Sequence, residues 1–302
     1  MPVDFFAGQR QINTWGGRIG DYLGSSVFRR TIGSCLILVV YVIIGRSIED
    51  HFGFNLHLPV NDVSLFGAAL SLLMVLRTNS AYDRWWEGRK LWGALVNNCR
   101  NLSLKITSMA QVNEEEFQRA EELIVTFPIA LKEHLRNGAT EETIGHLSVP
   151  CPDHVTHFPA YLSGELFSLI RGWRADAKLD KIDQHLIDSH ISSLMDICGA
   201  CERIRNTPLP LTHRALIPQL LALYLLVVPL GLELTVLNLI VTLGVSYFML
   251  GLEIAAEDIE EPFGHDCNDL PLDLISDNIG RSVKEVFATR MTQDSRSSHT
   301  VS

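Results

Sequence analysis

Uncharged apolar runs alternate with charged stretches along this chain. A helix needs about 20 residues to cross the roughly 30 Å hydrocarbon core of a bilayer. The last two runs reach that length, the second reaches it only if it starts near Val60, and the first only if flanking residues extend it. We therefore predict four membrane-spanning helices, the last two joined as a hairpin. The runs occupy residues 31–45, 63–76, 215–232 and 234–252.

The long charged stretch between the second and third spans has apolar residues at every third or fourth position. This spacing predicts amphipathic helices. The helix of the second span is expected to continue through Met109 as one rod. A second helix is expected to begin at Asn113, which can exchange capping hydrogen bonds with Glu116, and to end before Asn137. Further helices are expected at residues 161–177, 182–204 and 278–290.

The fold class that follows is all-α, with a long helical insert between the second and third spans. After Met291 the chain has too few apolar residues to pack by itself, so we expect this segment to be disordered, or ordered only where it lies on a neighbouring segment. The predicted segments are a cytosolic N-terminal segment at 1–30, spans one and two at 31–80, the cytosolic helical region at 81–212, spans three and four at 213–256, and a cytosolic C-terminal segment at 257–302.

Basic residues gather at one end of each of the first three spans, and they set the expected orientation. Arg29 and Arg30 precede the first span, and Arg214 precedes the third. Lysine and arginine favour the cytoplasmic side. The first 28 residues have no apolar centre that would make them a cleaved signal peptide. We therefore expect a multi-pass membrane protein, in contact with lipid, with both termini in the cytoplasm.

A cationic and aromatic sequence ends the second span abruptly. Tryptophan rings favour the headgroup level of a bilayer, because they are apolar with one polar edge. We therefore interpret this group as an interfacial signature that holds the second span at the cytoplasmic surface. Its members are Arg77, Arg84, Trp85, Trp86 and Trp92.

Composition excludes some classes of function. The formal net charge of −10 argues against nucleic acid as a partner, because phosphate binding requires clustered lysine and arginine. The six cysteines are scattered, so we expect reduced thiols rather than a disulfide framework. The sequence has no phosphate-binding glycine-rich loop and no recognisable nucleophile and base pair. We expect no enzymatic activity and no cofactor.

Two cysteine-containing groups are candidate metal sites. Cys198 and Cys201 have the spacing of a redox or zinc pair, but they lie in a helical pattern and are interpreted as buried structural thiols. Cys151, His154 and His157 form a tighter group in a proline-rich loop, from which a loop could wrap a metal. A solvated loop is the alternative to that site.

The second span carries a stripe of residues that recur every four positions. Ser64, Ala68, Leu72 and Leu76 lie along one helical face, and the small members allow close approach of another backbone. One interpretation is ordinary helix packing within the membrane. The other places the stripe on a pore axis, where a ring of leucines forms a constriction that excludes water and gates ions.

The signature run resembles that of the bestrophin family in its bacterial form. The resemblance rests on residues 77–93 with the Arg84-Trp85-Trp86 triplet, and on Glu261-Pro-Phe-Gly264 after the fourth span. It extends over most of the chain. Bestrophins are homopentameric ion channels in which the second span lines a narrow neck and cytosolic helices enclose a vestibule with a second constriction.

The resemblance implies specific pore residues. The neck maps to Ala68, Leu72 and Leu76, the stripe that the periodicity had already singled out. The cytosolic aperture maps to His185, with Leu186 one register away. Histidine is the side chain that changes charge near neutral pH, so an aperture formed by His185 would make conduction pH-dependent.

The resemblance also implies a passive channel for small monovalent ions. It favours chloride and other anions, and a monovalent-cation channel that conducts sodium is the alternative. Two alternatives from other functional classes are a membrane-anchored sensor and a secondary transporter. Animal bestrophins hold calcium with an acidic run after Pro-Phe-Gly, of which this chain keeps Asp266 and Asp269. Calcium is therefore a possible ligand, but we expect no calcium gating.

Overall fold

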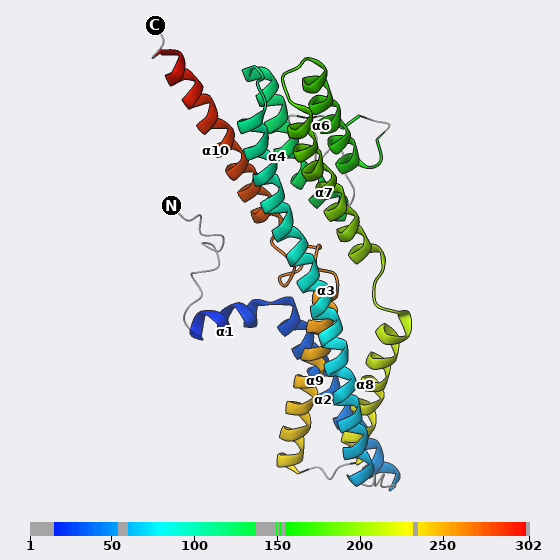
Figure 1. The fold of residues 1–302 in the computed structure, drawn as a ribbon. Coiled ribbons are helices and arrows are strands. Elements are labelled where there is room, and N and C mark those ends of the chain that lie inside the picture. The colour runs from blue at the N-terminus through cyan, green and yellow to red at the C-terminus, as the bar shows by residue number, and fades with distance from the viewer. Residues whose placement is uncertain are drawn as a thin grey trace. The chain divides into compact units, whose positions relative to one another are not determined.

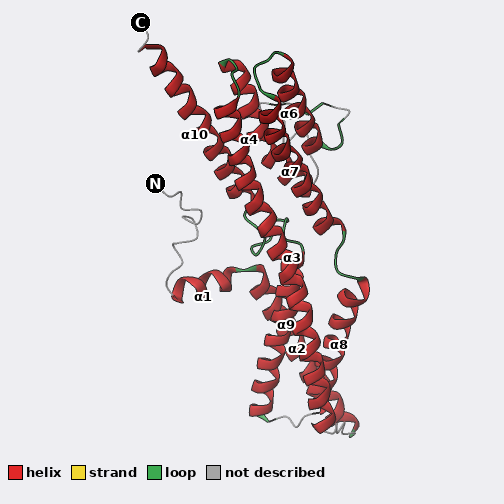
Figure 2. Cartoon of the chain, in the orientation of Figure 1, coloured by secondary structure: helices red, strands yellow, loops and turns green. Residues whose placement is uncertain are grey.

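The computed structural model describes residues 15–53, 60–136, 149, 151–152, 155–231 and 235–299. Every regular element in these ranges is a helix (Figure 2), so the predicted all-α class is confirmed. The helices are labelled in Figure 1 and are α1 (Trp15–Gly24), α2 (Ser26–Phe52), α3 (Val60–Met109), α4 (Glu114–Arg136), α6 (Phe158–Ala175), α7 (Lys181–Asn206), α8 (Leu211–Gly231), α9 (Val236–Glu260) and α10 (Leu272–His299).

The chain divides into two compact units. The first comprises Met1–Trp85 with Pro208–Asp269, and the second comprises Trp86–Thr207 with Leu270–Ser302. The first unit contains α1, α2, α8, α9 and the beginning of α3, and the second contains α4, α6, α7, α10 and the remainder of α3. The predicted continuation of the second span as a single rod is confirmed, because α3 is one 50-residue helix.

Long apolar helices dominate the first unit. Three helical stretches are long and apolar enough to cross a membrane: Ser26–Phe52, Val63–Met109 and Val236–Glu260. The apolar stretch of α8 that the structure describes, Arg214–Pro229, is shorter. Three of the four predicted spans therefore meet the criterion of length and composition within the described residues.

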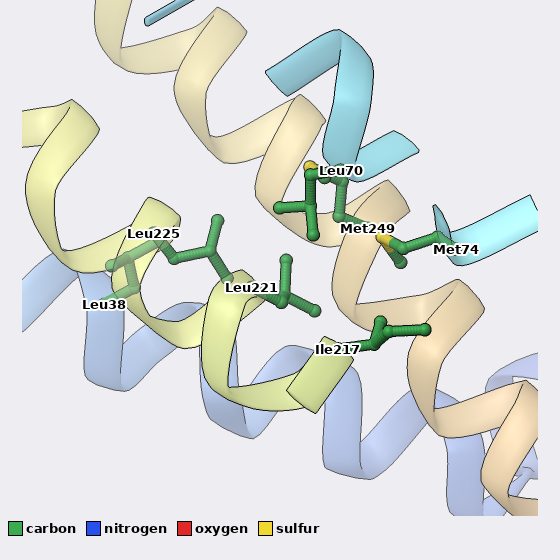
Figure 3. Close-up of a cluster of buried hydrophobic side chains, with 7 residues drawn as sticks. All are labelled: Leu38, Leu70, Met74, Ile217, Leu221, Leu225 and Met249. Atoms are coloured by element: carbon green, nitrogen blue, oxygen red, sulfur yellow. The ribbon is translucent and has the colours of Figure 1, made fainter. Parts of the chain in front are cut away.

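A cluster of apolar side chains holds these four helices together. Figure 3 shows side chains from α2, α3, α8 and α9 pointing toward one another. α3 contributes two positions four residues apart and α8 contributes three at the same spacing, so one face of each of these helices is buried, while α2 and α9 contribute one residue each. Inside a membrane such packing stabilises by close van der Waals contact, since lipid is as apolar as the side chains. The cluster consists of Leu38, Leu70, Met74, Ile217, Leu221, Leu225 and Met249.

The side chain of Arg46, near the end of α2, is held by contacts with other groups of the first unit. Arg46 forms an ion pair with Glu49 at 2.6 Å and donates a hydrogen bond to the backbone oxygen of Pro229 at 3.1 Å. Pro229 lies in the last turn of α8, where the backbone carbonyls have no donor within the helix, so its oxygen can accept from the guanidinium.

Arg77 is the centre of a buried ionic group in the first unit. Its guanidinium lies 2.9 Å from the carboxylate of Glu253 and 4.0 Å from that of Glu260. It also donates a hydrogen bond to the backbone oxygen of Arg214 at 3.2 Å, and the Arg214 guanidinium lies 3.3 Å from Glu260. Two arginines and two carboxylates thus join α3 to the start of α8 and the end of α9.

The second unit has a conventional apolar core. α4 packs against α6, α7 and α10, and α6 packs against α7. The predicted cap of α4 is confirmed, since the Asn113 N–H donates to Glu116 Oε2 at 3.2 Å and the Glu116 N–H donates to Asn113 Oδ1 at 2.9 Å. The largest fully buried side chains of this unit are Trp92, Phe127, Phe158, Trp173 and Phe287.

Two helices of the second unit begin earlier than predicted. α6 begins at Phe158, because the His157 ring accepts a hydrogen bond from the Ala160 N–H at 3.1 Å and so caps the helix. α10 begins at Leu272 and extends to His299, beyond the predicted 278–290. Its first turn is held by Asp273, whose carboxylate lies 2.7 Å from Lys132 and 2.9 Å from Arg136.

The expected disorder after Met291 is wrong for the residues up to His299, which continue α10. Extending a helix that has already formed adds a hydrogen bond for each residue fixed, whereas starting one is costly. A polar sequence that could not nucleate a helix alone can therefore continue one. The prediction of disorder rested on the small number of apolar residues in this segment and did not include its continuity with the preceding helix.

We predict that the substitution Arg77→Gln strongly destabilises the protein. It would leave the carboxylates of Glu253 and Glu260 buried without their shared cation, and breaking a buried ion pair in this way costs about 3–5 kcal/mol. The double variant Arg77→Gln/Glu253→Gln should recover part of the loss. Thermal unfolding of the detergent-solubilised protein, followed by circular dichroism, measures the change.

Arg203→Gln is the matched control. Arg203 and Glu87 form an exposed pair at 3.7 Å in the second unit. Exposed pairs contribute roughly 0–1 kcal/mol, so this variant should unfold near the temperature of the wild type. An Arg77→Gln protein as stable as the control would show that the buried group does not hold the first unit together.

Candidate functional site

The face of α3 opposite the apolar cluster is exposed in the chain. Leu72 and Leu76 are 63% and 55% exposed, and Ala68 lies on the same stripe and is also exposed. Leu70 and Met74, on the other face, are buried against α8 and α9. α3 therefore uses one face to pack within its unit and leaves the predicted neck residues uncovered.

The stripe continues past Leu76 with polar side chains. Asn79 and Asp83 follow at three and seven positions beyond it, and both are exposed. Ser80 is exposed too, and its hydroxyl donates to the backbone oxygen of Leu76 at 3.0 Å. Sequence reasoning missed Asn79 and Asp83, because it followed a strict spacing of four, whereas these two lie three and seven positions beyond Leu76 on the same helical face.

Two side chains of the signature run bond to other segments of the chain, and a third is exposed. Arg84 Nε donates to the backbone oxygen of Glu260 at 3.1 Å, and Trp85 Nε1 donates to that of Asn268 at 3.0 Å. These bonds attach α3 to the end of α9 and to the segment after it. Trp86 is 42% exposed, with the Arg89 guanidinium 6.0 Å from its ring centre.

Two members of the predicted interfacial signature lie inside the protein. Trp92 is fully buried, and Arg77 is buried between the carboxylates described above. Both side chains are buried within the chain rather than presented at its surface. The placement of the whole run at the membrane surface stays a prediction. Periodicity gave no sign of the burial of Arg77, because its partners lie 137 or more residues away in sequence.

The Glu-Pro-Phe-Gly motif forms a turn at the end of α9. Phe263 is buried, and the Asp269 carboxylate accepts a hydrogen bond from the Asp266 N–H at 2.6 Å. The Asp269 N–H donates in return to the Asp266 backbone oxygen at 3.1 Å. Asp269 thus has a role in closing the turn. Within the described residues, neither aspartate belongs to a cluster of three potential metal ligands.

The predicted aperture residues lie in the first turns of α7. His185 and Leu186 are exposed, and the Leu186 backbone oxygen accepts a hydrogen bond from Lys105 Nζ at 3.3 Å. Burial raises the pKa of the Asp188 carboxyl, while its hydrogen bond with Gln184 and the charge of His185 partly oppose that rise. Opposite charges from Lys105 and Asp188 therefore flank this turn.

The cysteine-containing candidates do not form metal sites in the described residues. Burial raises the pKa of both Cys198 and Cys201 to about 12, so both remain neutral thiols, in keeping with a structural role. Cys151 Sγ lies 3.8 Å and 3.9 Å from the backbone oxygens of Pro152 and Val155. None of the six cysteines forms a disulfide.

The third residue of the predicted Cys151 site has other partners. His154 lies outside the described residues. His157 Nε2 lies 2.8 Å from Glu202 Oε1, and His134 Nε2 lies 2.6 Å from the same oxygen. Burial alone would raise the pKa of the Glu202 carboxyl, but the hydrogen bonds and charges of the two histidines outweigh it and hold that pKa below its ordinary value. The spacing of residues along the sequence could not predict that His134 and Glu202 lie beside His157.

Comparison with known proteins finds relatives along most of the chain. A voltage-dependent anion channel-forming protein of Nostoc sp. is 32% identical over 282 residues, which cover 88% of this chain and 88% of that protein. A protein of the same description from Synechocystis sp. is 31% identical over 270 residues, which cover 85% of this chain and 87% of that protein.

Solved structures show the same fold. A crystal structure of a bacterial bestrophin homologue from Klebsiella pneumoniae has a TM-score of 0.77 at 25% identity, covering 85% of this chain and 98% of that one. The family model described as bacterial and fungal bestrophin protein matches residues 9–285. Because that match extends through both units and includes the α3 signature and the Glu-Pro-Phe-Gly turn, the chain belongs to the bacterial and fungal bestrophin family.

Proposed function

We propose that this protein is a passive anion channel of the bacterial inner membrane. Five copies of the chain would surround a pore, with α3 of each copy lining a narrow neck. Membership of the bestrophin family supports this function, and so do relatives whose names describe them as anion channel-forming proteins. No catalytic activity and no cofactor enter the proposal, and calcium is not required.

The observation that carries the proposal is the uncovered stripe on α3. The stripe changes along its length from the apolar Leu72 and Leu76 to the polar Asn79 and the charged Asp83, all exposed. Charged side chains within or beside membrane spans face protein or a water-filled path rather than lipid. A stripe that passes smoothly into such residues suits a pore wall better than a lipid-facing surface.

The leucines would form the gate of this pore. A ring of apolar side chains at a constriction excludes water and so blocks hydrated ions, and small widening restores the wet, conducting state. Ala68 would make one level of the neck wider than the two leucine levels. An apolar neck supplies no fixed charge, so the selectivity of this channel would come from groups elsewhere along the pore.

The membrane topology in the proposal has four spans and places both termini in the cytoplasm. Three apolar helices long enough to span, with the shorter α8 as the fourth, support the count. Arg30 lies near the beginning of α2, and Arg214 lies near the beginning of α8. Because lysine and arginine favour the cytoplasmic side of a membrane, the proposal places these two helix ends in the cytoplasm. The lipid bilayer would then contact the remaining apolar surface of α2, α8 and α9.

A second constriction is proposed at His185, with Leu186 as the alternative residue. Both are exposed in the second unit, so both are free to face a shared axis in an assembly. Protonation of His185 would add positive charge beside Lys105, whose amino group is bound to the Leu186 backbone oxygen. Anion conduction should then increase as the pH falls.

A monovalent-cation channel of the same fold is the second candidate. Asp83 favours it, since a ring of exposed carboxylates at a pore mouth attracts cations and repels anions. The two candidates give reversal potentials of opposite sign when proteoliposomes are placed in a sodium chloride gradient. That sign decides between them without altering the rest of the proposal.

We predict that Leu72→Ala and Leu76→Ala each increase single-channel current several-fold, and that the double variant increases it further. Truncation removes the apolar atoms that exclude water from the neck, so the pore would stay wet for a larger share of the time. Planar-bilayer recordings of the purified protein in symmetric sodium chloride measure the effect.

Leu36→Ala is the matched control, because Leu36 is 62% exposed but lies on α2. It should conduct as the wild type does. Equal effects of the α2 and α3 substitutions, or none from any of them in a folded and oligomeric protein, would refute a neck at the α3 stripe.

We predict that His185→Ala makes conduction less dependent on pH. Histidine changes charge between about pH 5 and pH 8, and loss of the ring removes the group that would bring positive charge to the aperture. The current of the wild type should rise as pH falls through this interval, and that of the variant should change less.

His51→Ala serves as the comparison, since His51 is exposed at the end of α2 and is not assigned to the pore. It should retain the wild-type pH profile. A His185→Ala channel whose profile matches that of the wild type would remove His185 from the aperture and leave Leu186.

A further inference from the structure

Three ligating side chains from three helices converge in the second unit, in a place to which the proposed channel function gives no role. His134 lies in the last turn of α4, His157 precedes the first residue of α6, and Glu202 lies in α7. Their potential ligand atoms all lie within 4.8 Å of one another. Each residue is partly buried, so the group is neither a solvated surface patch nor closed to small solutes.

The geometry of the group is set by the helices that carry it. The two imidazole rings lie with their centres 4.5 Å apart and tilted by 33°, and both direct Nε2 at Glu202 Oε1. Arg205, one turn beyond Glu202 in α7, donates to the His134 backbone oxygen at 2.6 Å and so fixes the end of α4. His134 and Glu202 are therefore held on packed helices, which position a ligand for a metal better than a loop does, and His157 is held at the helix cap.

Stapling the three helices is the simpler role for this group. Hydrogen bonds from both rings to Glu202 would be enough for that purpose, and here both rings do share a single carboxylate oxygen. The separations of 2.6 Å and 2.8 Å are those of hydrogen bonds. In a tetrahedral zinc site the bond lengths of about 2.0–2.1 Å put neighbouring ligand atoms roughly 3.3 Å apart. A small outward movement of the side chains would make room for an ion.

One hydrogen bond opposes metal binding. His157 Nδ1 accepts from the Ala160 N–H at 3.1 Å, so the hydrogen of the neutral ring lies on Nε2. A metal at Nε2 would shift that hydrogen to Nδ1 and end the cap of α6. Loss of a single cap is a modest cost beside the binding free energy of a zinc ion held by three protein ligands. Metal binding and the start of α6 are therefore coupled.

We propose that His134, His157 and Glu202 bind a first-row divalent transition metal, with Zn²⁺ as the representative ion. Two imidazoles and one carboxylate select zinc, cobalt or nickel over magnesium and calcium, which prefer oxygen ligands. Three protein ligands leave a fourth position for water. The ion would join α4, α6 and α7, and it would bind whether or not the chain conducts anions.

The test uses the full-length protein in detergent, stripped of metal and freed of any polyhistidine tag. Equilibrium dialysis against Zn²⁺ should give one tightly bound ion per chain, and Zn²⁺ should raise the unfolding temperature. Co²⁺ in its place should give the visible absorption of a tetrahedral site. Magnesium and calcium at the same concentrations should neither bind nor displace zinc.

His134→Gln and Glu202→Gln should each weaken zinc binding by more than about 100-fold. Loss of a residue that only hydrogen-bonds to a metal ligand already lowers metal affinity by about 10–100-fold. Glutamine at either position can still form a hydrogen bond across the group, so the staple is kept while a ligand is lost. Metal-free unfolding temperatures close to that of the wild type would show that these variants are folded.

Cys151→Ser is the matched control, because Cys151 lies six positions before His157 and is not among the potential ligand atoms that converge with it. It should bind zinc as the wild type does. Absence of zinc binding by the wild type, or zinc that persists in folded His134→Gln and is lost in Cys151→Ser, would overturn the proposed site.

Discussion

The buried ionic group around Arg77 is the interaction on which the first unit depends. A guanidinium removed from water needs carboxylates and carbonyl oxygens placed around it, and Glu253, Glu260 and the Arg214 backbone supply them. Satisfying those partners fixes the rotation of α3 about its own axis. The same requirement joins segments that lie far apart along the chain.

Fixing the rotation of α3 determines which of its faces remains uncovered. With Arg77, Leu70 and Met74 turned inward, Leu72 and Leu76 must face outward. The structural role of the cation and the proposed role of the leucines are therefore two consequences of one helix orientation. The hydrogen bonds of Arg84 and Trp85 hold the same orientation a few turns further along α3.

The second unit is organised differently, by an apolar core with polar groups at the helix ends. The Asn113 cap, the Asp273 ion pairs and the His157 cap each define where a helix begins. His157 has a further role, since its other ring nitrogen faces Glu202 beside His134. A helix terminus and a candidate metal site thus share one side chain, which makes this end of α6 the part of the unit that a bound ion would affect most.

The sequence by itself determined the helical class, the long α3 rod, the Asn113 cap and the existence of the leucine stripe, because each depends on spacing along a single helix, whereas the exposure of that stripe was decided by the tertiary structure. The family was recognisable from two short motifs, because each of them is a continuous stretch of sequence. Only the tertiary structure decided that Arg77 and Trp92 are buried, that Asp269 closes a turn, and that His157 meets His134 and Glu202 rather than Cys151. These facts depend on contacts between distant segments, and no local period encodes which segments will meet.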